Sequence, residues 1–367
     1  MIYLNGLNGI RAIAAIAVVV SHITLSLEIF GLSPYIIGQL PNGKPMTLDL
    51  AGYGVSMFFA LSGFLITYLL WAEKDKGSIN IRKFYLRRIL RIWPLYYSYM
   101  LLCLVVYFVF SIEFNYNSLY YYVFYSANLP FVFGGVLPFL THFWSLGVEE
   151  QFYIFWPWIN TFKKKNIIYF IYSLIVILLS TKIALHIFVP GTLLESFIHV
   201  TRFHCMLFGA LAAIYYKNKM PIFITVFTNK YIQLLAWGIM LLISFNQFHF
   251  ISFLDNEIVS IITVVIIIGQ VTKKGLISLE NKVFDFLGKI SYGIYVVHPL
   301  LIFLFSKVLY HITDHSYLNY IIVYVSILFS TIVISYLSFV YLETPFLKLK
   351  KEKFTVIKST SFKSTKF

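Results

Sequence analysis

Residues 50–72 read LAGYGVSMFFALSGFLITYLLWA and contain no charged side chain. A helix needs about 20 mostly apolar residues to cross the hydrocarbon core of a bilayer, so this stretch predicts a membrane-spanning helix. Similar stretches recur from one end of the chain to the other. They predict ten spans, at 8–27, 50–72, 93–112, 145–162, 166–189, 197–216, 231–248, 253–272, 289–310 and 319–342. The predicted fold class is therefore an all-α integral membrane protein, a ten-helix polytopic bundle.

The composition favours a membrane protein over a soluble one. Of the 367 residues, 59% are hydrophobic and 12% charged, whereas soluble domains carry about a quarter charged residues. A compact soluble fold of this length could not bury so much apolar surface. Cys103 and Cys205 lie in apolar stretches, so we interpret them as core residues and not as a disulfide pair or metal ligands.

The basic residues predict the orientation of the chain. With the N-terminus in the cytoplasm and ten spans, most of the 29 lysines and arginines fall in cytoplasmic segments, and the outer loops hold only Lys44. We therefore predict a multi-pass protein of the inner membrane with both termini cytoplasmic. The net charge of +14 then faces membrane lipids, and no nucleic acid partner is expected.

The same pattern predicts the domain organisation. Prolines and glycines interrupt or follow the apolar part of 113–144, so this segment is predicted to lie at the outer side or to be re-entrant. Residues 1–347 form the predicted membrane domain, and 348–367 form a basic cytoplasmic tail.

Charged side chains are costly inside a membrane, which makes Arg11 and His22 of the first predicted span functional candidates. Eleven residues of helix rise about 16 Å and turn through three full turns plus roughly 20°, so the two side chains share a helix face. Taken alone, Arg11 could be a snorkelling anchor, and His22 could be a core histidine bonded to a carbonyl. Their common face weakens both alternatives.

A basic cluster precedes the third predicted span. Arg87 and Arg91 lie one helical turn apart with Arg88 beside them, so the cluster could hold phosphates through charge-assisted hydrogen bonds. Anchoring to anionic lipid headgroups explains the same spacing and is favoured on spacing alone.

Two carboxylates, Glu149 and Glu150, lie near the outer start of the fourth predicted span, shortly after His142. A helix N-terminus favours a carboxylate, so capping is the simplest interpretation of one of them. The two side chains point about 100° apart and cannot both face one partner.

The remaining polar residues of the spans carry weaker signals. His298 precedes Pro299 within a span, where a freed backbone group could bond the imidazole, so we interpret it as structural. His199, Arg202 and His204 lie at the outer end of the sixth predicted span. The histidines and carboxylates are not spaced like metal ligands, and no metal is predicted.

Six segments together resemble the integral-membrane acyltransferase-three family, whose members O-acylate surface glycans. They are Arg11 with His22, Phe-Phe-Ala-Leu-Ser-Gly-Phe-Leu at 58–65, Arg-x-x-Arg-x-x-Pro at 88–94, Trp-Ser-Leu-x-x-Glu-x-x-Phe-Tyr at 144–153, Ser-Tyr-Gly-Ile-Tyr at 291–295 with His298, and Glu-x-Pro at 343–345. Each segment is a weak signal alone, and their common order along most of the chain makes the resemblance specific.

The resemblance implies an O-acyltransferase with a ten-helix fold. It implies acetyl-CoA, or another acyl-CoA, as the donor substrate. Its expected acceptor is a surface glycan such as lipopolysaccharide O-antigen, capsule or peptidoglycan, or a lipid-linked glycan precursor. Many relatives carry an aspartate where this chain has His204, so the acceptor specificity can differ here.

The resemblance and the spacing together predict the site. Arg88 and Arg91, with Arg11, would hold the donor phosphates at the cytoplasmic face. His22 would be the general base on a glycan hydroxyl, and Glu149 would orient its imidazole. A covalent acyl-histidine intermediate is the variant of this scheme.

Two other functions fit the intramembrane charges. A transporter or flippase could use Arg11, His22 and Glu149 as a proton or anion path. A non-catalytic partner of a polysaccharide synthase would not need these charges at all.

Overall fold

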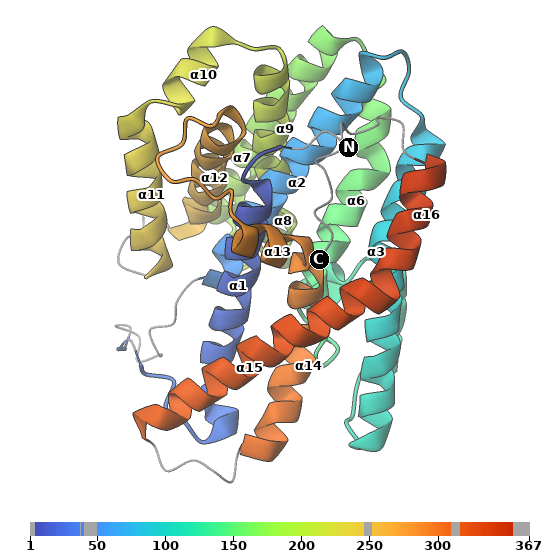
Figure 1. Ribbon diagram of the computed structural model, residues 1–367, viewed down its shortest axis with the longest axis vertical. Helices are drawn as coiled ribbons and strands as arrows, with labels where there is room; N and C mark the ends of the chain where they lie inside the picture. The colour runs from blue at the N-terminus through green and yellow to red at the C-terminus, as the bar shows by residue number, and fades with distance from the viewer. Residues whose placement is uncertain (1–3, 37, 40–49, 246–251, 310–315, 355–367) are drawn as a thin grey trace.

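The computed structural model describes residues 4–36, 38–39, 50–245, 252–309 and 316–354 of the chain. Throughout these ranges the elements are helices joined by loops, without a β-strand (Figure 1). The all-α fold class is thus confirmed.

Most of the helices are long. They are α1 (Leu7–Leu25), α2 (Leu50–Lys74), α3 (Ile81–Val109), α6 (Phe143–Ile159), α7 (Lys164–Phe188), α9 (Phe203–Lys217), α11 (Lys230–Ser244), α12 (Asp255–Thr272), α14 (Ser291–Leu309) and α15 (Tyr317–Leu337). The shorter ones are α4 (Leu119–Val123), α5 (Asn128–Phe133), α8 (Leu193–Thr201), α10 (Pro221–Phe227), α13 (Lys282–Lys289) and α16 (Thr344–Phe354). A π-helical segment, Ser338–Glu343, joins α15 to α16.

Several of these helices have the length and hydropathy of membrane spans. Among the described residues there are eight such helices, or nine if α10 and α11, which bend by 54° at their junction, form one span. The predicted span at 145–162 corresponds to α6, whose 17 residues fall short of the about 20 that a span needs. A multi-pass membrane protein is confirmed, whereas the count of ten and the cytoplasmic termini stay predictions.

Two predicted segments differ in detail from the structure, whereas a third, 113–144, lacks a spanning helix as predicted. Helix α3 begins at Ile81, where the Asn80 side chain accepts a hydrogen bond from the Lys83 amide at 2.9 Å, so the basic cluster belongs to the same helix as the span after it. The span predicted at 197–216 is broken at Arg202, whose φ is 27°. The segment 113–144 holds only short helices, and none could cross a bilayer.

Helix α2 lies at the centre of the bundle, in contact with α1, α9 and α12 (Figure 1). Its closest neighbour is α9, and glycines permit this approach. A Cβ atom on Gly63 would lie 1.9 Å from the Met206 carbonyl oxygen, and one on Gly209 would lie 1.9 Å from that of Ala60. Small residues allow helix backbones to pack closely in membranes.

This crossing leads to the first prediction. Gly209→Ala forces a methyl group against the backbone of α2, and such overpacking costs about 1–3 kcal/mol. We expect a lower melting temperature in detergent. Gly238→Ala is the control, because nothing lies within 4 Å of the added Cβ there. Equal melting temperatures for the two variants would contradict the crossing.

Candidate active site

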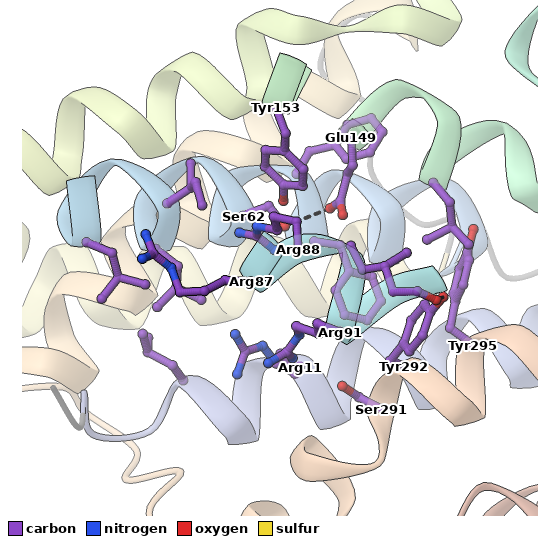
Figure 2. Close-up of a pocket in the computed structure, with 18 of the residues that line it drawn as sticks. Arg11, Ser62, Arg87, Arg88, Arg91, Glu149, Tyr153, Ser291, Tyr292 and Tyr295 are labelled. Atoms are coloured by element: carbon purple, nitrogen blue, oxygen red, sulfur yellow. Dashed lines mark hydrogen bonds between the residues drawn. The ribbon is translucent and has the colours of Figure 1, made fainter. Parts of the chain in front are cut away.

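A cavity of about 370 Å³ opens between α1, α2, α3, α6, α14 and α16 (Figure 2). Its walls come from the start of α1, the end of α2 and the start of α3, which therefore meet at one end of the bundle. We call it the basic cavity, because its charged lining residues are Arg11, Arg87, Arg88, Arg91 and Lys350 against Glu73 and Glu149.

The arginines of the basic cavity are held in distinct ways. Arg11 donates to the Asn8 side-chain oxygen at 3.1 Å, and Arg87 pairs with Glu73 at 3.0 Å. The Arg88 guanidinium lies 4.2 Å from the centroid of the Tyr153 ring. The three arginines predicted to bind a donor, Arg11, Arg88 and Arg91, thus line one cavity although they come from two helices.

The charges of this lining do not balance. Five cationic side chains face two carboxylates, which leaves an excess of three positive charges within a half-enclosed space. Concentrated charge of one sign in a cleft attracts ligands of the opposite sign. The basic cavity is therefore suited to a ligand with several negative charges, and phosphate groups match the arginine geometry.

Glu149 lines the basic cavity. Its Oε1 atom accepts a hydrogen bond of 2.7 Å from the Ser62 hydroxyl (Figure 2). Glu150 does not line the cavity, as its different direction on the helix predicts. The expected contact between Glu149 and His22 does not form, because Glu149 bonds Ser62 and His22 bonds another histidine.

The partner of His22 is His298, which lies 276 positions away along the chain. The Nδ1 atom of His22 is 2.7 Å from Nε2 of His298, and Nδ1 of His298 is 3.1 Å from the Ile294 carbonyl oxygen. A carbonyl oxygen only accepts, so neutral His298 donates from Nδ1 and accepts at Nε2. His22 must then donate from Nδ1, which leaves its Nε2 as a proton acceptor.

His298 therefore has a role beyond the structural one predicted from its proline. It fixes the tautomer and orientation of His22, which is the role expected of Glu149. In the sequence, His298 is marked only by its position after the Ser-Tyr-Gly-Ile-Tyr segment. That pattern does not indicate that His22 is its partner.

His22 lies just beyond the end of the basic cavity that is deepest in the bundle, next to Tyr295. Tyr295 lines the cavity, and its ring centroid is 6.1 Å from that of His298. Ser145, also in the lining, lies 2.6 Å from the Tyr295 hydroxyl. The cavity and the histidine pair are thus neighbours through Tyr295.

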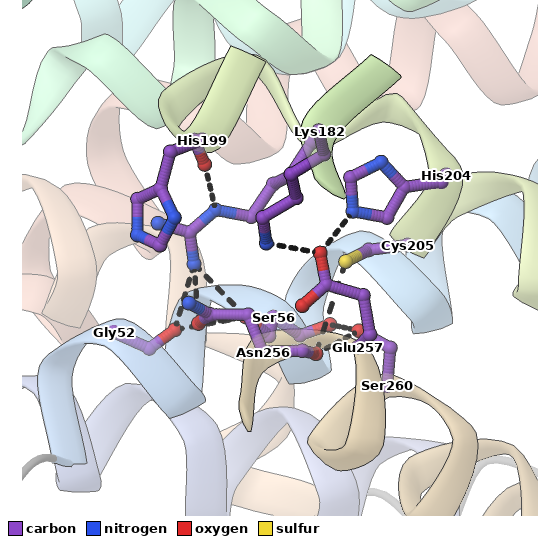
Figure 3. A network of polar contacts seen from close by, with 10 residues as sticks. Gly52, Ser56, Lys182, His199, His204, Cys205, Asn256, Glu257 and Ser260 are labelled. Atoms are coloured by element: carbon purple, nitrogen blue, oxygen red, sulfur yellow. Dashed lines mark hydrogen bonds and ion pairs between the residues drawn. The ribbon is translucent and has the colours of Figure 1, made fainter. Parts of the chain in front are cut away.

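A second polar network lies at the other end of α2 (Figure 3). Buried Arg202 donates to the Asn256 side-chain oxygen at 2.5 Å and to the Ser56 hydroxyl at 3.1 Å. Ser56 and Glu73 of the basic cavity are 17 positions apart on α2, or about 25 Å along a helix. The network is therefore far from the Glu73 end of the basic cavity, whose lining extends along α2 to Val55, the neighbour of Ser56.

The same network contains a buried ionic cluster. Glu257 forms a short ion pair with Lys182 and lies 2.5 Å from the His204 ring (Figure 3). All three side chains are buried. His204 and Lys182 therefore contact the same Glu257 carboxylate.

A second cavity, of about 310 Å³, adjoins this network. Phe131 and Phe253 supply apolar walls, and Lys182, Ser196 and His199 are among the polar lining residues. Within the described part of the chain, neither the Ser196 hydroxyl nor the His199 ring has a hydrogen-bond partner. Both lie on α8, one turn apart, so they can bond a ligand together.

The ionic cluster leads to the second prediction. Lys182→Met leaves Glu257 with one cationic partner, and removing one member of a buried ion pair costs about 3–5 kcal/mol. We expect a large loss of folded protein in detergent extracts, measured by size-exclusion chromatography. Lys307→Met is the control, because Lys307 is exposed on α14. A normal yield of the Lys182 variant would show that the cluster is not needed for stability.

Comparison with known proteins identifies the family. Residues 4–340 match the acyltransferase domain of the acyltransferase-three family. The chain belongs to this family of membrane acyltransferases. No solved structure matches the chain.

Several curated proteins are similar in sequence. The peptidoglycan O-acetyltransferase OatA of Listeria monocytogenes serovar 1/2a is 36% identical over 118 residues, which cover 28% of this chain and 19% of that protein. A putative acetyltransferase, ORF330, of Acidianus two-tailed virus is 29% identical over 272 residues, covering 70% of this chain and 75% of that protein. The O-acetyltransferase OatA of Staphylococcus aureus strain NCTC 8325 is 28% identical over 284 residues, covering 69% of this chain and 46% of that protein. The chain therefore spans less than half the length of the OatA proteins.

Proposed function

We propose that the protein is an O-acetyltransferase of the inner membrane that moves an acetyl group from acetyl-CoA to a hydroxyl group of a cell-surface polysaccharide. The observation that carries the proposal is the arrangement of one basic cavity beside a histidine with a free proton-accepting nitrogen. The similarity to proteins named as O-acetyltransferases supports acetyl as the transferred group.

The donor follows from the charge of the basic cavity. Coenzyme A carries a pyrophosphate and a 3′-phosphate, which together offset an excess of three positive charges. Arg11, Arg88 and Arg91 bind these phosphates, and the pantetheine arm extends along α1 toward His22. Arg11 and His22 are separated by about 16 Å along α1. An extended pantetheine arm spans this distance.

The chemistry follows from the tautomer of His22. The acceptor hydroxyl oxygen attacks the thioester carbonyl, and its proton passes to Nε2 of His22. The carbon–sulfur bond then breaks, and the proton moves from the imidazolium to the coenzyme A thiolate. His298 holds the ring in place and stabilises the proton on Nδ1. Glu149 has a different task from the one expected, because it holds Ser62 and offsets part of the arginine charge of the cavity.

The acceptor reaches His22 from the end of the bundle opposite the donor. The second cavity supports this route, because its aromatic walls and paired hydrogen-bonding groups on α8 suit a sugar ring. The ring of Phe131, which lines the second cavity, is stacked 5.2 Å from that of Trp144, and Trp144 directly precedes Ser145 of the basic cavity lining. The two cavities thus approach one another in the middle of the bundle.

The third prediction concerns His22. His22→Ala removes the base, and general base catalysis contributes about 10²–10⁴-fold to a rate. We expect acetyl transfer from radiolabelled acetyl-CoA to extracted polysaccharide to fall by that factor in purified protein, while acetyl-CoA binding persists. Glu149→Gln should also lower transfer, because it removes the carboxylate charge that accepts from Ser62 in the basic cavity. Glu28→Gln, exposed after α1, is the control.

Full transfer activity in the His22 variant would overturn the proposed chemistry. Absence of any acetyl-CoA binding or transfer by the wild-type protein would instead favour a transporter or a non-catalytic partner.

The fourth prediction concerns the acceptor. The double variant Ser196→Ala with His199→Ala removes both hydrogen-bonding groups from the second cavity. We expect a higher KM for the polysaccharide, by about tenfold for two lost hydrogen bonds, with the slow hydrolysis of acetyl-CoA in the absence of acceptor unchanged. An unchanged KM for the polysaccharide would exclude this cavity as the acceptor route.

A further inference from the structure

The short helix α13 packs against the start of α1 (Figure 1). It begins after Asn281, whose side chain accepts a hydrogen bond from the Phe284 amide at 2.9 Å. The two helices approach closely, because a Cβ atom on Gly288 would lie 2.1 Å from the Asn8 carbonyl oxygen. The side chains of α13 are therefore fixed relative to the first turn of α1, which leads into the basic cavity.

Asp285 of α13 is connected to Arg11 through the side chain of Asn8. The amide nitrogen of Asn8 donates to Oδ1 of Asp285 at 2.5 Å. The amide oxygen of Asn8 accepts from the Arg11 guanidinium at 3.1 Å. Asn8 and Arg11 line the basic cavity, whereas Asp285 does not. Asp285 thus contacts the lining of the cavity from outside it.

The charges on either side of Asn8 fix the orientation of its amide. Lys289 pairs with the other oxygen of Asp285, Oδ2, at 2.7 Å. Burial raises the pKa of Asp285, but hydrogen bonds from Lys289 and Asn8 outweigh it and hold the pKa below its ordinary value. The ionised carboxylate only accepts hydrogen bonds, and a guanidinium only donates them. The Asn8 nitrogen must therefore face Asp285, which leaves its oxygen for Arg11.

This orientation matters for the binding of an anion by Arg11. Without Asp285 the Asn8 amide can rotate by half a turn, and its nitrogen cannot accept a hydrogen bond from Arg11. A long side chain that is not held beforehand loses more conformational freedom when it binds a ligand. Residues that hold a binding group in place therefore contribute to affinity without touching the ligand.

We infer that Asp285 is a positioning residue, which fixes the Asn8 amide and so holds the Arg11 guanidinium ready for a phosphate group of the donor. This inference rests on the proposed function, because it takes the donor to be acetyl-CoA. It also makes a prediction about sign. Removing a negative charge near a cationic cavity strengthens anion binding if charge alone matters, whereas loss of positioning weakens it.

The test compares purified full-length variants with two ligands. Titration calorimetry gives the Kd for acetyl-CoA, and competition gives that for S-acetyl-pantetheine, which lacks the nucleotide phosphates. Asp285→Ala removes the acceptor for Asn8, whereas Asp285→Asn keeps an acceptor oxygen without the charge. Lys289→Gln is the matched control, because it breaks the ion pair of Asp285 and leaves the bond to Asn8 in place.

For acetyl-CoA we expect the Kd to rise about fivefold in Asp285→Ala, as for one lost hydrogen bond. Asp285→Asn and Lys289→Gln should stay close to wild type. In an Arg11→Ala background, adding Asp285→Ala should change the Kd no further, because the side chain that it positions is absent. For S-acetyl-pantetheine, Asp285→Ala and wild type should be equal.

An unchanged or lower Kd for acetyl-CoA in Asp285→Ala would overturn the inference and leave the proposed function intact. Equal losses for both ligands, or a further loss in the Arg11→Ala background, would show that Asp285 acts on the fold and not through Arg11. Either result would overturn the inference as well. Absence of acetyl-CoA binding by the wild type would overturn both the inference and the proposed function.

Discussion

An excess of positive charge around one half-enclosed cavity is the constraint on which the rest of the site depends. The cationic side chains of the basic cavity outnumber its carboxylates by three, and three helices, α1, α3 and α16, supply them. Helix packing alone would not place so many like charges around one space, because their repulsion opposes folding. A polyanionic ligand removes that cost. The cavity is then best understood as a site completed by its donor.

The bundle separates donor and acceptor chemistry along its length. Helix α2 connects the two ends, with Glu73 in the basic cavity and Ser56 in the opposite network. Helix α1 follows the same course from Arg11 to His22. Close packing at the glycines of α2 and α9 makes this axis rigid. The fold thus places His22 next to the basic cavity, through His298 and Tyr295.

The sequence predicted much of this arrangement, because membrane spans and costly charges leave local signals. Apolar runs gave the helices, and Arg11, Arg88 and Arg91, which were expected to act together, line one cavity. Glu149 was expected beside His22 and instead lines that cavity with the arginines. The pairing of His22 with His298 could not be predicted, since helical periodicity defines a face but not which distant face it meets. The position of Lys350 in the cavity lining could not be predicted for a related reason. A lysine in a basic tail has the same sequence pattern whether it faces water or a cavity.

Transfer across the bundle can be measured most directly in proteoliposomes of one orientation. Acetyl-CoA is sealed on the side of the basic cavity, and deacetylated polysaccharide is added on the other side. If the donor and acceptor sites meet at His22 from opposite sides, acetyl esters accumulate on the external polysaccharide. They do not form in the His22→Ala variant. Ester formation only when both substrates are on one side would contradict this geometry.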